Sequence, residues 1–392
     1  MNSKVYQFIK GRVGQFKRIE DACKGVENII WVHAASYGEF EEIRPVIEAL
    51  KRIRPGFKFL VTFFSPSGYE HLKNDNVADF VFYLPLDTKR NARRFLDLVR
   101  PVCVLVSISD YWLNFLHEIR RRGIPSYLVS ARFLPGMVYF KPIGKRYLEA
   151  FKTCFTKIIV NDPSSLDVLQ AAGVTNAALA GDPRMDRVNA IASTKWSDAL
   201  VDKWCGGQKV FVAGSTLPDE DDECIIAAAN AFPSDKFIII PHEQGAGQIQ
   251  HLETSIQGRT VRYTDPGDGF ESAQVLIVDT VGMLSKLYRY GFAAFVGSGF
   301  SGESVHSVIE PAAYGIPVSF GPIFGTQMHC RKLVDAGAAK SVGSKEEFCE
   351  WYASLKSNPT LMKVMGEAAL AYCRKSGGVA ETIARMVLFS GK

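Results

Sequence analysis

The chain has 392 residues, of which 47% are hydrophobic and 22% charged, and its formal net charge is +5 at pH 7. This composition fits a globular protein of two ordinary domains and excludes a disordered chain. A net charge of +5 is too small for a nucleic-acid-binding surface unless the charge is clustered. The sequence therefore argues against nucleic acid as a partner.

Eight cysteines are scattered without a CxxC pair, and the seven histidines form no cluster at metal-ligand spacing. Neither a zinc site nor a disulfide framework is expected, and a reducing cytoplasm is the simplest interpretation. No stretch approaches the ~18 apolar residues of a membrane-spanning helix, and no signal peptide is apparent. Residues 1–20 are basic and amphipathic, so they either lie on a membrane or pack as a helix.

Short apolar runs alternate with longer amphipathic segments in the first half of the chain. The runs predict strands over residues 28–34, 57–64, 79–85, 101–108, 125–131 and 156–162. The intervening patterns predict helices over 40–53, 90–99, 113–123 and 164–174. Apolar strands that alternate with helices indicate a parallel sheet covered on both faces.

The alternation stops around residues 186–208 and then resumes with strands predicted over 209–215, 236–242, 275–280, 293–299 and 317–322. We therefore expect an α/β fold of two Rossmann-like, doubly wound domains that face a cleft. Their predicted limits are residues 1–186 and 209–375, joined by a linker at 187–208. A C-terminal helix in residues 376–392 could pack back on the first domain. Ligands bind at the carboxyl edges of such sheets, so the loops after strands are the candidate sites.

The first of these loops reads HAASYGEFEE, and it places Glu39 at the start of a helix. Gly38 permits a tight turn, and Ser36 can cap the helix. A glutamate in this position either compensates the helix dipole or acts as a catalytic base that faces a cleft. The sequence alone leaves both interpretations open.

Two further loops have the composition of an anion site. Gly214, Ser215 and Thr216 follow the first strand of the second domain and precede a helix. Gly297, Gly299 and Gly302 lead into a predicted helix that carries His306 and Glu310, which Pro311 would kink or shorten. The glycines do not have dinucleotide-fingerprint spacing, and no Walker lysine follows. We expect a nucleotide-sugar site in which amides hold the phosphate and Glu310 binds the ribose hydroxyls.

Two more strand ends carry polar residues, His242 with Glu243 and Asp279 with Thr280. Each could be an ordinary turn. The recurrence of such loops at the carboxyl ends of strands favours a functional interpretation.

Taken together, the chain resembles the Kdo transferases of lipopolysaccharide synthesis, in a Bacteroides-like version. The resemblance extends over nearly the whole chain after about Phe8. It is carried by an ordered set of segments: HAASYGEFEEIRP, LVTFFSPSGYE, YLPLDTKRNARRFLDLVRP, RRRGIPSYLVSARF, GDPRMDRV, VAGST, PHE, DTVGMLSKLYRYGFAAFVG and IEPAAYGIPVSFGP. The family has the GT-B architecture. It transfers 3-deoxy-D-manno-octulosonic acid (Kdo) from CMP-Kdo to a lipid A precursor, lipid IVA, with inversion.

The resemblance implies roles for individual residues. The general base falls on Glu39. The CMP-Kdo site falls on Gly214, Ser215, Thr216, Pro241, His242, Glu243, Asp279, Thr280, Gly297, Gly299, Gly302, His306, Ser307 and Glu310. The acceptor side of the active site falls on Ser36, Gly38, Asp110, Trp112, Asn114 and Arg132. No metal ion and no cofactor is implied.

The chain departs from the family pattern at three positions. Asp110 replaces the usual Glu, Ile108 occupies a position that is often charged, and Ser307 stands where Asn is common. The usual apolar N-terminal anchor is also missing. Either an anchor precedes this chain, or attachment uses the basic face of the N-terminal domain alone.

The implied location is the cytoplasmic face of the bacterial inner membrane, where the enzyme is peripheral or anchored. Residues 132–151 mix aromatic with basic side chains, as a surface that meets anionic lipid would. Two alternatives remain. One is another GT-B enzyme that uses a different nucleotide sugar, and the other is a non-catalytic homologue that binds lipid or nucleotide.

Overall fold

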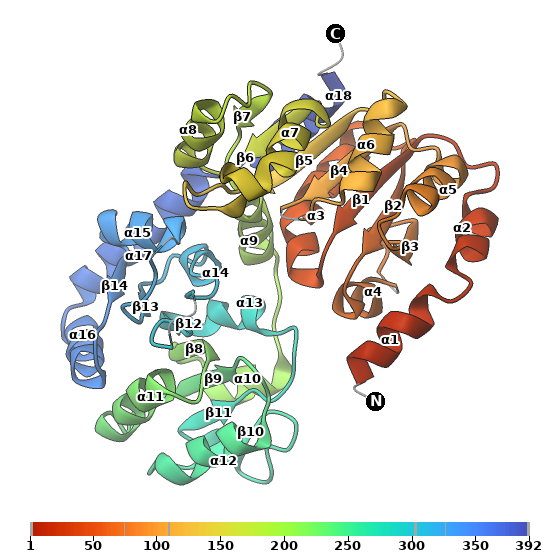
Figure 1. Ribbon diagram of the computed structural model, residues 1–392. Helices are drawn as coiled ribbons and strands as arrows, with labels where there is room; N and C mark the ends of the chain where they lie inside the picture. The colour runs from red at the N-terminus through yellow and green to blue at the C-terminus, as the bar shows by residue number, and fades with distance from the viewer. Residues whose placement is uncertain (1–2, 74, 109, 302–303, 326, 390–392) are drawn as a thin grey trace. The chain divides into compact units, whose positions relative to one another are not determined.

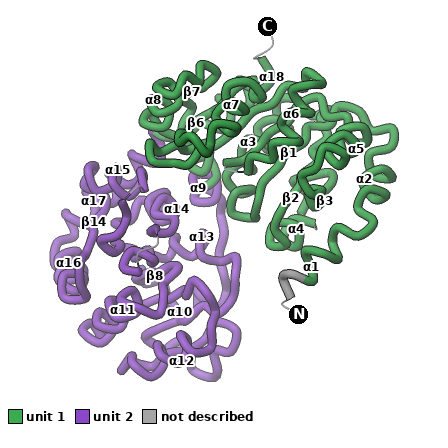
Figure 2. The backbone as a smooth tube through the Cα atoms, viewed as in Figure 1, with its two compact units in different colours: residues 1–187, 376–392 green, residues 188–375 purple. Residues whose placement is uncertain are grey.

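The computed structural model describes residues 3–73, 75–108, 110–301, 304–325 and 327–389, and it forms two compact units. Unit 1 combines the residues up to 187 with those from 376 onward, and unit 2 contains residues 188–375 (Figure 2). Each unit is built on its own seven-stranded sheet (Figure 1).

The sheet of unit 1 is entirely parallel, with the strand order β3-β2-β1-β4-β5-β6-β7. Its strands are β1 (Ile29–Ala34), β2 (Lys58–Phe63), β3 (Phe80–Tyr83), β4 (Cys103–Ser107), β5 (Ser126–Ala131), β6 (Lys157–Val160) and β7 (Ala177–Leu179). The chain winds outward from β1 to β3 and then from β4 to β7 on the other side. The switch point therefore lies between β1 and β4.

Helices cover both faces of this sheet because its strands are apolar on both sides. They are α1 (Ser3–Arg12), α2 (Gln15–Cys23), α3 (Tyr37–Ile53), α4 (Pro66–Leu72), α5 (Lys89–Val99), α6 (Leu113–Arg121), α7 (Lys145–Thr153), α8 (Pro163–Ala171), the start of α9 (Arg184–Ser193) and α18 (Val379–Phe389), with the 3-10 turns η1 (Val138–Phe140) and η2 (Pro142–Gly144). One core contains Phe95 and Phe115 of α5 and α6, and the other contains Ile43 and Ile383 of α3 and α18.

The sheet of unit 2 is also parallel, with the order β10-β11-β9-β8-β12-β13-β14. Its strands are β8 (Val210–Thr216), β9 (Phe237–Pro241), β10 (Thr260–Arg262), β11 (Val275–Ile277), β12 (Gly291–Val296), β13 (Val318–Phe320) and β14 (Ala339–Ser341). Its helical segments are α10 (Ala199–Cys205), α11 (Glu220–Ala231), α12 (Ala246–Ser255), η3 (Phe270–Ser272), α13 (Leu284–Leu287), η4 (Tyr288–Tyr290), α14 (Ile309–Ala312), α15 (Met328–Asp335), α16 (Lys345–Ser357) and α17 (Pro359–Lys375). The prediction of two doubly wound α/β folds is confirmed.

Three strands were not predicted, namely β7, β10 and β14, each of three residues. All three are edge strands, and each pairs with a single neighbouring strand. Runs this short have no periodicity that separates them from loops.

The helix α18 completes unit 1 by packing on α3. The carboxylate of Asp186 accepts hydrogen bonds from the backbone N–H groups of Gly378 and Ala380, at 2.5 and 2.6 Å, and so satisfies amides at the start of α18. Ile383 is fully buried, and the hydroxyl of Tyr127 donates to the carbonyl of Val387 at 3.1 Å. Since α18 lies along α3, these contacts support the helix that carries Glu39.

We predict that Asp186→Ala lowers the free energy of unfolding by about 1–3 kcal/mol, because two amides at the start of α18 lose their acceptor. Urea unfolding of the full chain measures this loss. Asp167→Ala, which removes an exposed carboxylate on α8, is the matched control and should change little. Equal stability of the two variants would contradict the role of Asp186.

Candidate functional site

Glu39 lies in the first turn of α3, directly after β1. The hydroxyl of Ser107, the last residue of β4, donates to the Glu39 carbonyl at 2.7 Å and so fixes this turn against the switch point of the sheet. One carboxylate oxygen of Glu39, Oε2, is buried and has no hydrogen-bond partner within the described part of the chain. A carboxylate oxygen in this state is a strong acceptor for an incoming hydroxyl.

The turn before Glu39 is open around Gly38. A Cβ atom added at Gly38 would meet only the Ser36 hydroxyl, at 3.9 Å. Ser36 is the N-cap residue of α3, but its side chain makes no capping hydrogen bond. The turn therefore has open space at Gly38, and the Ser36 hydroxyl is not used as a cap.

A second carboxylate, Glu42, lies one turn further along α3. Its Oε1 is 3.4 Å from Nη1 of Arg184, which in turn forms a two-pronged pair with the buried Asp182. Burial raises the pKa of Glu42 to about 7, with Arg184 opposing the shift and the charges of Asp182 and Glu39 adding to it. Two glutamates, an arginine and an aspartate therefore share this end of unit 1.

A buried histidine links β1 to the loop after β4. His33 makes hydrogen-bond contacts through Nδ1 with Thr62, at 3.0 Å to the hydroxyl, and through Nε2 with Oδ2 of Asp110, at 3.2 Å. The indole N–H of Trp112 points at both Asp110 Oδ2 and His33 Nε2, at 3.3 and 3.2 Å. The structure thus brings the predicted residues Asp110 and Trp112 together. It adds His33, which sequence reasoning missed because its apolar strand suggests only a core position.

The loop that presents Asp110 contains a strained backbone. Ile108 has a φ of +53°, in the left-handed region that β-branched residues avoid. Such a conformation costs roughly 1–3 kcal/mol and tends to occur at functional sites. This is the position where the family resemblance leads one to expect a charged residue.

The other two residues predicted for the acceptor side differ in their availability. The amide of Asn114 donates to the backbone carbonyl of Asp87 at 3.0 Å and to its Oδ2 at 3.2 Å, so it serves the start of α6. Arg132 directly follows β5 and is half-buried.

In unit 2, Gly214 and Ser215 lie within β8, as the strand predicted over 209–215 implies, and the strand extends one residue further to include Thr216. The pairing with β9 shifts between Gly214 and Thr216, and Ser215 between them has a φ of +56°. This bulge lets Thr216 pair with Pro241, the last residue of β9. Thr216 at the end of β8 is therefore still paired in the sheet, which the apolar pattern of the strand does not reveal.

Asp221 at the start of α11 joins this strand end to the glycine-rich stretch. Its Oδ2 accepts hydrogen bonds from the backbone N–H groups of Leu217 and Ser298, at 3.0 and 2.7 Å. The residue is fully buried, and burial raises its pKa to about 7 despite these two bonds. A Cβ at Gly297 would lie 2.2 Å from the Ser215 carbonyl oxygen, so only glycine allows the two segments to approach this closely.

His242 and His306 meet at the same edge of the sheet, with ring centroids 4.3 Å apart and an interplanar angle of 23°. His242 follows Pro241, and its N–H donates to the Thr216 carbonyl at 2.9 Å. Burial, and then the proximity of His242, lowers the pKa of His306 to about 4, so His306 is neutral near pH 7. Three predicted segments, around residues 216, 242 and 306, therefore converge.

The helix predicted to carry His306 was wrong. Residues 304–307 are not helical, and α14 begins only at Ile309 and has four residues. Pro311 lies inside it and lacks the N–H that a longer helix would need. Ser307 is half-buried in the stretch before this short helix, and Gly302 lies outside the described residues.

The remaining predicted donor residues have mostly structural contacts. A Cβ at Gly299 would lie 2.6 Å from the backbone nitrogen of Gly321, so Gly299 is required by packing. Asp279 accepts hydrogen bonds from the backbone N–H and the hydroxyl of Thr264, while Thr280 beside it is half-buried and Glu243 is exposed. Burial and, to a smaller extent, the charge of Glu310 raise the pKa of Tyr288. A Cβ atom added at Gly214 would lie 2.2 Å from the Tyr288 hydroxyl.

Two absences among the described residues bear on the kind of site. Nowhere in these ranges do three or more His, Cys, Asp or Glu side chains gather as they would around a metal ion. Among the helices described, none combines the length and apolar character that crossing a bilayer requires.

The two sheets, with polar clusters at the carboxyl ends of their strands, define a GT-B fold. The UDP-GlcNAc 2-epimerase of Neisseria meningitidis, solved with UDP-GlcNAc, has a similar structure, with a TM-score of 0.66, 16% sequence identity, and coverage of 93% of this chain and 100% of that one. MurG of Acinetobacter baumannii has a TM-score of 0.58 at 14% identity, over 92% of this chain and 99% of that one. At such identities the likeness concerns the fold alone.

Residues 8–187 match the model of the 3-deoxy-D-manno-octulosonic-acid transferase (Kdo transferase) family. The chain is 28% identical to the 3-deoxy-D-manno-octulosonic acid transferase of Bordetella pertussis over 370 residues, 89% of this chain and 84% of that protein. It is 26% identical to the enzyme of the same name from Haemophilus influenzae over 332 residues, 82% of this chain and 77% of that protein. The resemblance to Kdo transferases that the sequence motifs indicate is confirmed.

We predict that Glu42→Gln changes the pH dependence of stability. Because the pKa of Glu42 is raised to about 7, the native state keeps a proton that the unfolded chain releases near pH 4.5, and wild-type stability therefore falls as the pH rises through this window. Gln removes this titration, so the stability of the variant relative to wild type should increase from pH 5 to pH 8, by up to about 3 kcal/mol. Urea unfolding at several pH values measures the difference. A difference that does not vary with pH would show that Glu42 titrates normally.

Proposed function

We propose that this protein is an inverting, metal-independent glycosyltransferase that moves Kdo from CMP-Kdo to a lipid A precursor, lipid IVA, in lipopolysaccharide synthesis. The match of residues 8–187 to the Kdo transferase family model and the names of the curated relatives support this reaction. The observation that carries the proposal is Glu39, whose buried Oε2 has no donor in the described chain although it lies at the switch point of the sheet.

In the proposed reaction, a hydroxyl of the acceptor attacks the anomeric carbon of Kdo. The hydroxyl needs a base because its pKa lies far above 7, and Glu39 takes the proton as the new C–O bond forms. The bond between the anomeric carbon and the CMP phosphate breaks in the same step. A single displacement of this kind inverts the configuration, so Glu39 acts as a base and not as a nucleophile.

CMP departs as a phosphate monoester, and the donor site has to stabilise its growing negative charge. We assign this task to the segments that Asp221 and the His242–His306 stack hold together. His242 is exposed and fixed by stacking, so an imidazole N–H can donate to a phosphate oxygen. Glu310 is assigned to the ribose hydroxyls. The scheme needs no metal ion, because these groups provide hydrogen-bond donors at the leaving group.

The acceptor and the membrane are assigned to unit 1. The turns η1 and η2 expose Val138 and Ile143, the latter to 83%. Lys141 and Lys145 are exposed beside them. Apolar side chains next to lysines suit the headgroup region of an anionic bilayer, and each basic residue there contributes about 1 kcal/mol. We therefore propose that the protein works as a peripheral enzyme at the cytoplasmic face of the inner membrane.

We predict that Glu39→Gln folds like wild type and loses transfer activity by about 100- to 10,000-fold, which is the usual contribution of a general base. The assay incubates the protein with CMP-Kdo and lipid IVA and follows the lipid by mass spectrometry. Glu48→Gln removes an exposed glutamate from the same helix and is the matched control. Near-full turnover by Glu39→Gln would remove Glu39 from the mechanism.

We also predict that CMP-Kdo, and not UDP-GlcNAc, is the donor, and that EDTA leaves the rate unchanged. Mass analysis of the lipid product with each donor, with and without EDTA, tests both statements. Transfer from the UDP-sugar would favour another GT-B activity. Binding of CMP-Kdo without any transfer would indicate a non-catalytic homologue, and loss of activity with EDTA would contradict the metal-independent scheme.

A further inference from the structure

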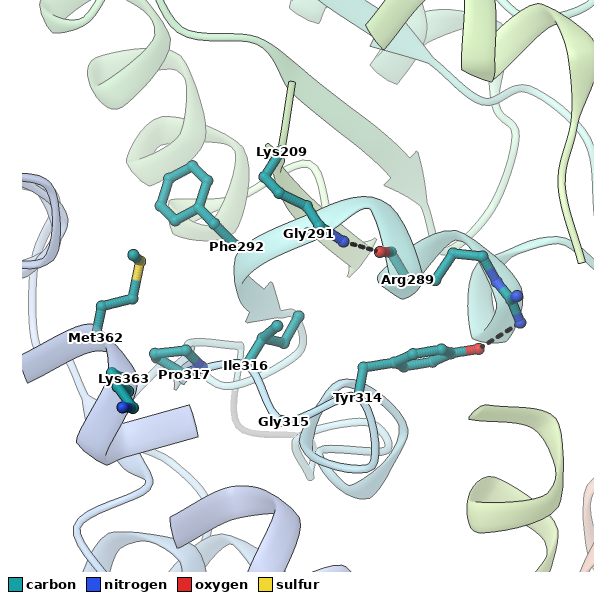
Figure 3. Close-up of a pocket in the computed structure, with 10 residues that line it drawn as sticks. All are labelled: Lys209, Arg289, Gly291, Phe292, Tyr314, Gly315, Ile316, Pro317, Met362 and Lys363. Carbon is teal, nitrogen blue, oxygen red and sulfur yellow. Dashed lines mark hydrogen bonds between the residues drawn. The ribbon is translucent and has the colours of Figure 1, made fainter. Parts of the chain in front are cut away.

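Unit 2 contains a cavity of about 470 Å³ at the amino-terminal end of its sheet (Figure 3). Lys209 precedes β8, Gly291 is the first residue of β12, and Pro317 precedes β13. The cavity therefore lies at the edge of the sheet opposite to residues 216, 242 and 306. Its volume is within the range of small-molecule sites, which is about 300–1,000 Å³.

The charge of the cavity is one-sided. Lys209, Arg289 and Lys363 contribute to the lining, and the described residues that line it include no Asp or Glu. Three cations around one cavity repel each other, and a bound anion relieves that repulsion. The lining therefore favours a negatively charged ligand.

Every described hydrogen-bond partner of the Arg289 guanidinium is neutral. Its guanidinium donates to the carbonyls of Lys286, Thr194, Trp196 and Ile191 and to the hydroxyl of Tyr314, at 2.9–3.4 Å. Figure 3 shows the bond to Tyr314 at one end of the cavity. Carbonyls orient the guanidinium but do not cancel its charge, so a positive charge is fixed there before any ligand arrives.

Both lysines keep hydrogen-bond donors for a ligand. Nζ of Lys209 donates to the carbonyl of Arg289 at 2.6 Å and has two further protons to donate. Nζ of Lys363 is 3.8 Å from Glu367, and both of these side chains are at least two-thirds exposed. An exposed pair at this distance is worth little, so an anion can compete for Lys363.

The rest of the lining is apolar and preformed. Phe292, Ile316, Pro317 and Met362 form this part, with Met362 and Lys363 contributed by α17 (Figure 3). A Cβ at Gly366 would lie 2.3 Å from the carbonyl oxygen of Gly315, so α17 packs directly on the turn that precedes β13. Close packing of this kind keeps the wall in place without a ligand.

We propose that this cavity binds a small amphiphilic anion, with its phosphate or carboxylate group near Lys209 and Lys363 and its apolar body against Phe292 and Met362. The proposal is independent of the transfer reaction, because none of the residues assigned to that reaction lines the cavity. The anion can come from the cytosol or from a membrane lipid, and the chemistry of the site is the same in both cases.

Hexyl phosphate is the probe, and isothermal titration calorimetry on the full chain is the measurement. We expect saturable binding at least tenfold tighter than that of inorganic phosphate or hexanol, since only the probe uses both parts of the lining. Excess CMP should not displace it. Absence of saturable binding at millimolar probe, or displacement by CMP, would overturn the proposal.

The double variant Lys209→Gln/Lys363→Gln should weaken hexyl phosphate binding at least tenfold. Lys332→Gln/Lys375→Gln removes the same charge from exposed positions of unit 2 outside the cavity, and it should bind as wild type does. An equal loss of affinity in both double variants would mean that only the net charge of the protein matters, and it would refute a defined site. If wild-type protein binds vesicles of anionic lipid more tightly than Lys209→Gln/Lys363→Gln does, the anion comes from a membrane lipid. If binding is confined to the soluble probe, the source is cytosolic.

Discussion

Parallel strand pairing is the constraint on which the candidate site depends. Every strand of both sheets runs in the same direction as its neighbours, so each helix must return the chain to the same edge before the next strand begins. The ends of strands far apart in sequence therefore gather at the other edge. For this reason Glu39 and Asp110 lie at the carboxyl edge of the sheet of unit 1. Thr216, His242 and His306 lie at the carboxyl edge of the sheet of unit 2.

Energetically unfavourable features concentrate at these carboxyl edges. Non-glycine residues with positive φ include Ile108 after β4, Ser215 in the last part of β8 and Ser298 after β12. Burial raises the pKa of Glu42 and of Asp221 at the same edges. Strained backbone and shifted carboxyls are tolerated where surrounding packing holds them, and they are commonly found where ligands bind. The cavity at the amino edge of unit 2 has a different character, since its fixed charges are cations.

The sequence was sufficient for features that depend on local pattern. The longer strands follow from apolar runs, and the switch-point loop with Glu39 follows from the small residues before a helix. The helix around His306 was wrong: Pro311 has no N–H to donate to the carbonyl of Ser307, and α14 begins only at Ile309. Interactions between distant residues were inaccessible: nothing local indicates that His33 contacts Asp110, or that Arg184 reaches Glu42. The role of Asp221 was hidden in an acidic run that any helix start could contain.

The attachment of α18 to unit 1 has a consequence for biosynthesis. Residues 188–375 leave the ribosome before residues 379–389, so unit 2 can finish folding while the first sheet still lacks one of its covering helices. During that interval the apolar face of α3, including Ile43 and Val46, has no α18 to cover it. The nascent first unit therefore stays incomplete until residues 379–389 have been synthesised, and a chain released after unit 2 would expose an apolar surface that chaperones or proteases bind.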